Sequence, residues 1–131
     1  MVNAERPFLA DLDVLPMPAW DLVPVERYLY RFGKSQRKLV LVTSRGCLFR
    51  CSFCYVIDFH NRKYRGRSAG RILEEVDYLQ KNFGIDAVRF DDDLFVIDRL
   101  RLREFCDWID RKDSRWLVVP RLSTRSARGF A

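Results

Sequence analysis

The sequence predicts an α/β fold whose parallel sheet is built from βαβ units. Three short apolar runs, at residues 39–42, 85–90 and 116–119, have the continuous apolar character of parallel strands that are buried on both faces. Between them lie two longer segments whose apolar residues recur at three- and four-residue intervals, as on one face of a helix. Crossovers between parallel strands are right-handed, and such sheets place their functional loops at the carboxyl ends of the strands.

Length and composition indicate a folded protein of one domain. The 131 residues are 48% hydrophobic and 14% aromatic, which is enough to bury a core and too apolar for a disordered chain. Residues 1–30 hold two basic and five acidic side chains, whereas residues 31–131 hold 22 basic and 13 acidic ones, a net charge of +9. A basic body can attract nucleic acid or anionic cofactors, but a solvated arginine-rich surface is the simpler interpretation.

Residues 1–30 form a proline-rich leader, and residues 31–131 form the domain that carries the predicted βαβ units. Proline interrupts helices and favours extended backbone, and the leader has neither a strand period nor a helix period. We therefore expect the segment 15–20 to lie along a surface, docked by Leu15, Met17 and Trp20. The prolines concerned are Pro7, Pro16, Pro18 and Pro24.

The first βα unit begins with a strand at Leu39–Val42, which ends in a loop opened by Gly46. Ser68 is the expected N-cap of the helix that follows, and Gly84 is its expected stop. The apolar face of this helix consists of Ile72, Val76, Leu79 and Phe83.

The second unit begins with a strand at Ile85–Phe90, followed by the acidic triplet Asp91, Asp92 and Asp93. Asp98 is the expected cap of the second helix. The apolar face of that helix reads Leu102, Phe105, Cys106 and Ile109, so Cys106 is expected to be a small core residue. A third strand is expected at Trp116–Val119, and the twelve residues after it are too few for another helix-strand unit.

Three of the four cysteines, Cys47, Cys51 and Cys54, fall within eight residues of the loop after the first strand. The chain has no segment of signal-peptide type and no apolar run approaching about 20 residues, which predicts a reducing cytoplasm and few disulfides. Thiolates are soft ligands, so three on one loop can hold three irons of a 4Fe-4S cluster and leave the fourth iron without a protein ligand. An open iron can take the amine and carboxylate of a bound molecule.

Two other interpretations of the cysteines stay open at this point. Structural zinc could be held by the three thiolates with His60 as the fourth ligand, although such sites usually combine pairs of ligands from separated segments. A thioredoxin-like redox pair of Cys51 and Cys54 would give Cys47 no task and would need a helix directly after the pair. The default interpretation of His60 is a surface residue or one that supports a ligand.

The cysteine loop resembles that of the radical S-adenosylmethionine superfamily. In both, the three cysteines are separated by three and two residues, and an aromatic residue, here Phe53, precedes the last. Further stretches resemble the cobalamin-associated branch of the superfamily, and the resemblance runs from about Asp11 to Arg121. These stretches are Leu12–Trp20, Ser44–Cys47 and Phe90–Phe95.

The resemblance implies that a reduced cluster splits S-adenosylmethionine into methionine and a 5′-deoxyadenosyl radical, which abstracts hydrogen from a substrate. It implies ligation by the three cysteines, adenine near the backbone of Phe53, and the methionine amine near Asp91 and Asp92. It also implies that Arg121 meets a carboxylate or a substrate anion. From the residues alone, the acidic triplet is equally well explained as a helix cap, and Arg121 as a surface residue.

The resemblance also implies a fold, cofactors and partners. The catalytic domain of the superfamily is a partial (β/α)6 barrel of TIM type, and this chain matches about its N-terminal half. The implied cofactors are a 4Fe-4S cluster, S-adenosylmethionine and, through a domain absent here, cobalamin, with flavodoxin or ferredoxin as electron donor. Half a barrel exposes a strand edge, so a complementary chain is an expected partner, and the chain alone is expected to be inactive. The parent protein is expected to catalyse methylation or a rearrangement.

Two alternatives to this function remain at the level of the sequence. One is a noncatalytic module that binds zinc or a bare cluster. The other is an RNA-modifying radical enzyme that uses the basic run beside the cysteine loop, although a solvated turn explains that run more simply and nucleic acid is not the expected partner. Positive charge near a cluster would also raise its reduction potential and attract a reductant or an anionic substrate. The run consists of Arg62, Lys63, Arg65, Arg67 and Arg71.

Overall fold

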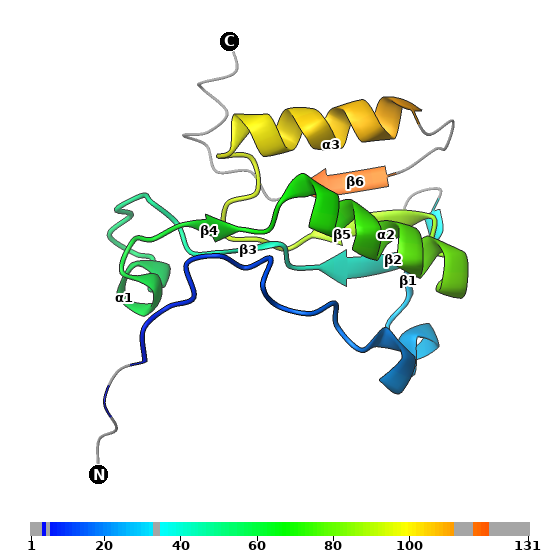
Figure 1. The fold of residues 1–131 in the computed structure, drawn as a ribbon, viewed down its shortest axis with the longest axis horizontal. Helices are drawn as coiled ribbons and strands as arrows, with labels where there is room; N and C mark the ends of the chain where they lie inside the picture. Colours follow the sequence, from blue (N-terminus) through cyan, green and yellow to red (C-terminus); the bar gives the residue numbers. More distant parts are fainter. Residues whose placement is uncertain (1–3, 5, 33–34, 112–116, 121–131) are drawn as a thin grey trace.

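The structure is a computed structural model that describes residues 4, 6–32, 35–111 and 117–120. Its main feature is a four-stranded sheet with strands in the spatial order β1, β2, β5, β6 (Figure 1). The strands are β1 (Tyr30–Phe32), β2 (Ser35–Leu41), β5 (Ala87–Phe90) and β6 (Leu117–Pro120). The predicted α/β class is confirmed, whereas closure toward a partial barrel stays a prediction.

The three strands of the predicted βαβ units pair in parallel. Lys38 of β2 lies opposite Ala87 of β5, and Ala87 in turn lies opposite Leu117 of β6. The sequence did not predict β1, which pairs antiparallel with β2. Because β2 begins at Ser35, it is longer at its start than the apolar run at residues 39–42 indicated.

The first predicted helix is confirmed as α2 (Ala69–Phe83). The Ser68 hydroxyl accepts a hydrogen bond from the Arg71 amide at 3.3 Å, so Ser68 is the N-cap. The helix ends at Gly84, whose φ of 60° is left-handed and whose amide donates to the carbonyl of Gln80. Local signals alone were enough to place both ends of this helix.

The second helix is α3 (Arg99–Arg111), and its cap is the predicted Asp98, whose carboxylate accepts from the Arg101 amide at 3.0 Å. The prediction that Cys106 is a core residue is wrong, because its side chain is exposed. The inward face of α3 is instead centred on Phe105, which packs against Trp108 with ring centroids 6.1 Å apart. Cys106 lies about 100° around the helix from Phe105 and therefore falls outside this face.

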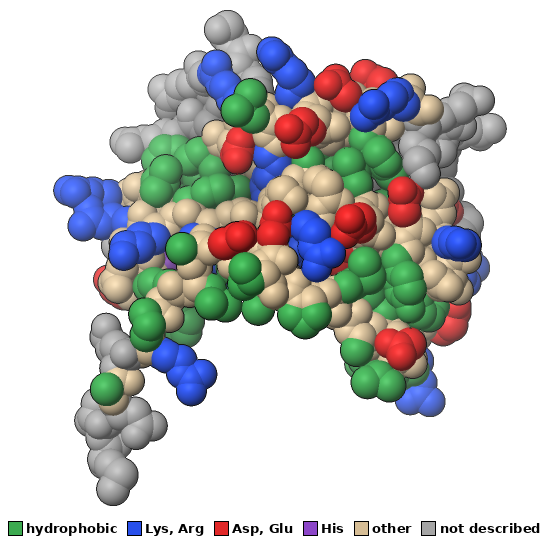
Figure 2. Space-filling view, in the orientation of Figure 1, with side chains coloured by type: hydrophobic (Ala, Val, Ile, Leu, Met, Phe, Trp, Pro, Cys, Tyr) green, Lys and Arg blue, Asp and Glu red, His purple; other side chains and the backbone are tan. Residues whose placement is uncertain are grey.

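The core lies between the sheet and the two helices, which contact each other on one face of the sheet. Alternate residues of β2 and β5 point into it, and buried members of the core from the two strands and α2 include Leu39, Leu41, Ile72, Val76, Leu79, Val88 and Phe90. The opposite face of the sheet is more open, since Val40 is 37% exposed. Figure 2 shows the side of the molecule on which α2 covers the sheet, and acidic and basic side chains are interspersed there.

The leader docks onto the domain, but not through all of the expected residues. Leu15 is 44% exposed, so its expected docking role is wrong, and Leu12 is buried in its place. Met17 is half-buried, and Trp20 begins a short 3-10 helix, Trp20–Leu22, and packs against the core. Docking by Leu12 and Trp20 leaves Val14 and Leu15 between them on the surface.

A small lobe precedes α2. It contains a two-stranded antiparallel sheet of β3 (Ser44–Arg45) and β4 (Arg65–Gly66), and the short helix α1 (Val56–His60) lies between these strands in the chain. The cysteine loop connects β3 to α1, and in Figure 1 this lobe projects beyond the end of β2. None of the helices in the described part of the chain is long and apolar enough to cross a membrane.

Candidate functional site

The cysteine loop begins at Gly46, directly after β3. The φ of Gly46 is 82°, in the left-handed region that favours glycine. A Cβ at this position would lie 2.2 Å from the backbone oxygen of Lys63 and 3.0 Å from the Cβ of His60. The entry to the loop therefore packs against the turn that follows α1, and only glycine fits there.

Cys47, Cys51 and Cys54 are free cysteines, and each is half-buried. The Cys54 amide donates to the carbonyl of Cys51 at 3.0 Å, which forms a turn between these two residues. Within the described residues, no three cysteine, histidine or carboxylate side chains are placed to hold a metal ion together. The structure thus gathers the cysteines on one loop beyond the end of β2 without converging their thiols. Three unpaired thiols on one short loop nevertheless fit the ligand chemistry of an iron-sulfur cluster.

The acidic triplet lies beside the entry to this loop, and its central carboxylate is fully buried. Asp92 accepts hydrogen bonds from the Thr43 amide at 2.7 Å, the Thr43 hydroxyl at 3.0 Å and the Ser44 hydroxyl at 2.7 Å. The Ser44 amide donates to the same carboxylate. These bonds join the end of β5 to the segment that enters the cysteine loop. Asp92 therefore has a positioning role, which the sequence did not separate from the predicted amine-binding role.

Asp91 is the member of the predicted pair that stays partly open, with a side chain that is 33% exposed. Its carboxylate accepts from the Arg89 guanidinium at 2.9 Å, and this hydrogen bond raises the pKa of Arg89. Phe53 is 91% exposed at the tip of the cysteine loop. The last predicted site residue, Arg121, lies outside the described residues.

Arg89 belongs to the sheet face that α2 and α3 leave open. Lys38 is on this face too, only 1% exposed, with its ammonium 5.3 Å from the ring centroid of Tyr30. Burial, together with the charge of Arg89, lowers the pKa of Lys38. Cationic side chains therefore line the open face as it approaches Asp91.

The sequence analysis assigned no role to Arg101, yet its side chain is buried near the end of the sheet. Its guanidinium donates to the carbonyl of Phe95 at 2.8 Å and to that of Thr43 at 3.5 Å, and it lies 4.9 Å from the ring centroid of Phe95. Burial raises the pKa of the neighbouring Tyr64 phenol, and the charge of Arg101 partly opposes this rise. Arg101 lies one helical turn before Phe105 on α3. This spacing places both residues on the inward face of the helix, and it was the only signal in the sequence for the burial of Arg101.

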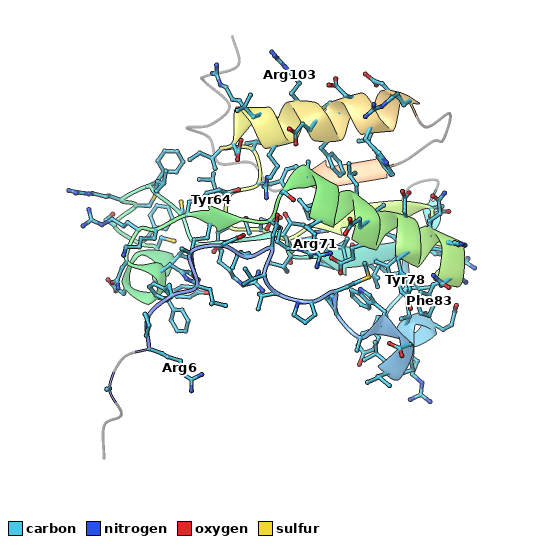
Figure 3. The ribbon with its side chains drawn as sticks, in the orientation of Figure 1. Arg6, Tyr64, Arg71, Tyr78, Phe83 and Arg103 are labelled. Atoms are coloured by element: carbon cyan, nitrogen blue, oxygen red, sulfur yellow. The ribbon has the colours of Figure 1, made fainter. Side chains whose placement is uncertain are left out.

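A buried carboxylate of α2, that of Glu75, ties the leader to this helix. Glu75 is 2% exposed and accepts from the Trp20 indole at 2.9 Å and from the Arg67 guanidinium. Arg71 also donates to the carbonyl of Leu15 at 3.1 Å, and it lies between α2 and the leader in Figure 3. The leader is thus held by polar contacts as well as by apolar ones.

His60, the expected fourth ligand in the zinc alternative, is engaged elsewhere. Its Nδ1 lies 3.3 Å from a guanidinium nitrogen of Arg65. Its ring centroid is 5.5 Å from that of Phe59 and 6.1 Å from that of Phe8. These contacts favour a supporting role for His60 and give the zinc alternative no support.

The basic run does not form one free cationic surface. Arg67 pairs with Glu75, Arg71 pairs with Glu74 at 2.8 Å, and Arg65 donates to the carbonyl of Leu9 at 3.1 Å. Arg62 and Lys63 are exposed and form no ion pair within the described part of the chain. Most of the run is therefore used internally, which argues against a continuous nucleic-acid stripe.

Comparison with known proteins finds relatives, although no family model matches. An uncharacterized methyltransferase of Pyrococcus horikoshii is 32% identical over 124 residues, which cover 91% of this chain and 26% of that protein. Cytidylyl-2-hydroxyethylphosphonate methyltransferase of Streptomyces wedmorensis is 35% identical over 102 residues, or 72% of this chain and 19% of that protein. Anaerobic magnesium-protoporphyrin IX monomethyl ester cyclase of Rubrivivax gelatinosus is 31% identical over 108 residues, with coverages of 82% and 19%.

The chain thus spans about a quarter or less of the length of these relatives. Two further relatives are named hopanoid C-3 methylase and hopanoid C-2 methylase, and they match 56% and 68% of this chain. The names of these relatives agree with the family resemblance that the cysteine loop, the leader and the acidic turn indicated. The chain is therefore similar, over most of its own length, to part of proteins that are named methyltransferases and anaerobic cyclases.

Proposed function

We propose that the chain is the cluster-binding part of a radical S-adenosylmethionine protein, with Cys47, Cys51 and Cys54 as ligands of three irons of a 4Fe-4S cluster. The observation that carries this proposal is the position of three free cysteines on one loop beyond the carboxyl end of the parallel strand β2. When bound, the cluster would supply an electron for the reductive cleavage of S-adenosylmethionine.

In this proposal the two predicted aspartates have different tasks. Asp92 holds Thr43 and Ser44, and through them it fixes the direction in which the chain enters the cysteine loop. Asp91 stands at the same strand end with part of its carboxylate exposed, so it is the better acceptor for the methionine amine. The exposed position of Phe53 leaves its backbone accessible to adenine.

We propose methyl transfer or a related rearrangement for a complete enzyme rather than for these 131 residues. The support is that relatives named methyltransferase, methylase or cyclase match most of this chain with a quarter or less of their own length. Cobalamin held by a further domain, and flavodoxin or ferredoxin as reductant, belong to the same proposal.

Anaerobic reconstitution with iron and sulfide tests cluster binding. We expect a brown protein with roughly four irons and four sulfides per chain, whose visible absorbance changes when S-adenosylmethionine is added. Replacing Cys47, Cys51 and Cys54 together with alanine should abolish the colour. Cys106→Ala is the matched control, because this exposed cysteine lies on α3, outside the loop.

The outcomes separate the proposal from its alternatives. A colourless protein that holds one zinc per chain would contradict cluster binding and restore the zinc module. A brown protein that forms no 5′-deoxyadenosine after reduction would keep cluster binding and remove turnover from this chain alone. A Cys106→Ala variant that loses the colour as fully as the triple variant would show that the loop cysteines are not the specific ligands.

A further inference from the structure

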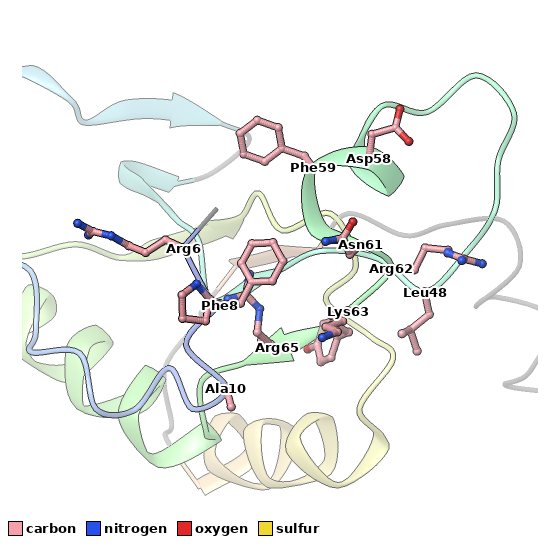
Figure 4. Close-up of a pocket in the computed structure, with 12 residues that line it drawn as sticks. Arg6, Phe8, Ala10, Leu48, Asp58, Phe59, Asn61, Arg62, Lys63 and Arg65 are labelled. Carbon is pink, nitrogen blue, oxygen red and sulfur yellow. The ribbon is translucent and has the colours of Figure 1, made fainter. Parts of the chain in front are cut away.

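A pocket of 960 Å³ lies beside the cysteine loop, on the side of the N-terminal segment (Figure 4). Its lining comes from residues between 6 and 10, from Leu48 of the cysteine loop, and from residues between 58 and 65. Small-molecule sites commonly have volumes of about 300–1,000 Å³. The proposed cluster chemistry assigns no task to this pocket.

The lining combines positive charge with aromatic rings. Arg6, Arg62, Lys63 and Arg65 contribute four cations, against the single carboxylate of Asp58. Two phenylalanine rings line the same space: Phe8 is 39% exposed and Phe59 is 71% exposed. Exposed aromatic rings beside unpaired cations are suited to a ligand that offers both a flat ring and a negative charge.

Arg65 assembles the pocket from segments that are distant in the sequence. Its guanidinium lies 4.5 Å from the ring centroid of Phe8 and donates to the carbonyl of Leu9 at 3.1 Å. Another of its nitrogens lies 3.3 Å from Nδ1 of His60. Figure 4 shows Arg65 beside Phe8, with Arg6 and Arg62 extending outward on opposite sides of the opening. The pocket is therefore formed before a ligand arrives.

One donor of Arg65 remains unused in this arrangement. Its Nε is buried and has no hydrogen-bond partner within the described part of the chain. Buried donors in proteins are nearly always paired, with protein, water or ligand. Because this nitrogen is buried, the contacts with Leu9, His60 and Phe8 hold the guanidinium in place, and Arg65 offers the pocket its positive charge rather than this donor.

The turn that carries two of the lining residues has an unusual backbone. Asn61 and Arg62 have φ values of 47° and 55°, and consecutive left-handed residues other than glycine are uncommon. Asn61 is the left-handed C-cap that ends α1, a common place for asparagine, so the unusual residue of this turn is Arg62. The following residue, Lys63, packs its carbonyl against Gly46 at the entry to the cysteine loop. A ligand in the pocket would thus touch the wall that supports that loop.

We propose that this pocket binds a planar aromatic anion, a ring system that bears a phosphate or a carboxylate. Arg62 and Lys63 receive the anionic group, Arg65 adds positive charge from the wall of the pocket, and the rings of Phe8 and Phe59 contact the planar part. Binding needs neither the cluster nor S-adenosylmethionine. The proposal can therefore fail or succeed independently of the proposed function.

Calorimetric titration of the chain whose three loop cysteines are replaced with alanine tests this inference, because that variant cannot hold the cluster. The probes are cytidine 5′-monophosphate as a nucleotide, 1-naphthoate as an aromatic carboxylate, uncharged cytidine, and inorganic phosphate. We expect at least one of the two aromatic anions to bind more tightly than both cytidine and phosphate, with an affinity that falls as salt is added. The anion that binds identifies the source of the negative group.

Variants then locate the site. Arg62→Gln with Lys63→Gln should weaken the binding of the aromatic anion by about tenfold or more, because two charge-assisted contacts are lost. Phe8→Leu keeps the apolar volume and should weaken the aromatic anion without affecting phosphate. Arg62→Gln alone should also weaken this binding, and Arg103→Gln is its charge-matched control, since Arg103 is exposed on α3, away from the pocket (Figure 3).

Several results would overturn the proposal. One is that neither aromatic anion binds. Another is that cytidine binds as tightly as its monophosphate, and a third is that inorganic phosphate binds as tightly as the aromatic anions. An equal loss of affinity in Arg103→Gln and in the double glutamine variant would also do so, since it would assign the binding to overall charge. Circular dichroism of each variant confirms that a loss of binding does not come from unfolding.

Discussion

The sheet with α2 and α3 and the lobe that carries the cysteines use apolar side chains in opposite ways. In the first region Val76, Leu79 and Phe90 have no exposed surface. In the second, Phe53 is 91% exposed and Tyr55 is 76% exposed. Large exposed aromatic residues gathered on one lobe are typical of a surface that binds something. The comparison indicates a stable platform that presents an open loop.

Buried polar groups form the boundary between the two regions. Asp92 receives its hydrogen bonds from Thr43 and Ser44 on the platform side of Gly46, and Arg101 donates to the carbonyl of Thr43 from below. Past Gly46, the cysteines are half-buried and make no disulfide. The platform therefore fixes where the loop begins, and in the proposed function the bound cluster would arrange the thiols.

The largest expected difference between the regions lies in leucine truncation. Leu79→Ala should lower the free energy of unfolding by about 3 kcal/mol, because it leaves a cavity at a fully buried core position. Leu48→Ala removes the same atoms from a side chain that is 50% exposed on the cysteine loop, and it should cost less than about 1 kcal/mol. Urea denaturation followed by circular dichroism measures both. Equal losses would show that the lobe is as tightly packed as the platform.

The boundary itself is tested at the acidic triplet. Asp92→Ala should destabilise the chain by about 2–3 kcal/mol, since it leaves buried donors of Thr43 and Ser44 without an acceptor. Asp93→Ala, at the half-buried neighbouring position, should change stability by no more than about 0.5 kcal/mol. The same urea experiment compares the two variants. A small effect at Asp92 would mean that the network does not hold the loop entry.

The platform was largely predictable from the sequence because its signals are local. Ser68 and Gly84 mark the ends of α2, and the apolar runs mark β2 and β5 to within a few residues. Caps and periodicity depend on residues a few positions apart, so they can be recognised in the sequence without knowledge of the rest of the fold. The parallel pairing of β2 and β5 then followed from the helix between them, because parallel strands need such a crossover connection.

The boundary and the lobe were less predictable because they depend on distant partners. The exposure of Cys106 follows from the way α3 rotates to place Arg101 and Phe105 inward, which periodicity cannot resolve to one residue. The pairing of β3 with β4 involves only two residues from each strand, which is too short for a pattern. Asp92 differs from Asp91 only in what surrounds it. Residue type indicated that both aspartates belong to the candidate site. Only the tertiary contacts show that Asp92 is buried against Thr43 and Ser44 while Asp91 stays partly exposed.

The loop entry should be sensitive to a single added methyl group. Gly46→Ala should destabilise the chain by about 2 kcal/mol, because the residue has a left-handed φ and its new Cβ would meet the backbone of Lys63. We also expect a lower yield of reconstituted cluster, measured as iron per chain. A variant with native stability and a full iron content would show that the turn after α1 moves freely and does not support the loop.

The smallest expected effect has the opposite sign and uses the same substitution on the platform. Gly70 lies in the first turn of α2, and a Cβ built there would meet only the Ser68 hydroxyl oxygen, at an ordinary contact distance of 3.9 Å. Gly70→Ala should therefore stabilise the chain by about 0.5–1 kcal/mol, because alanine loses less backbone entropy on folding. Thermal unfolding of Gly46→Ala and Gly70→Ala under identical conditions should shift the melting temperature in opposite directions. Shifts in the same direction would mean that the backbone on the two sides of the boundary does not differ in the way the structure shows.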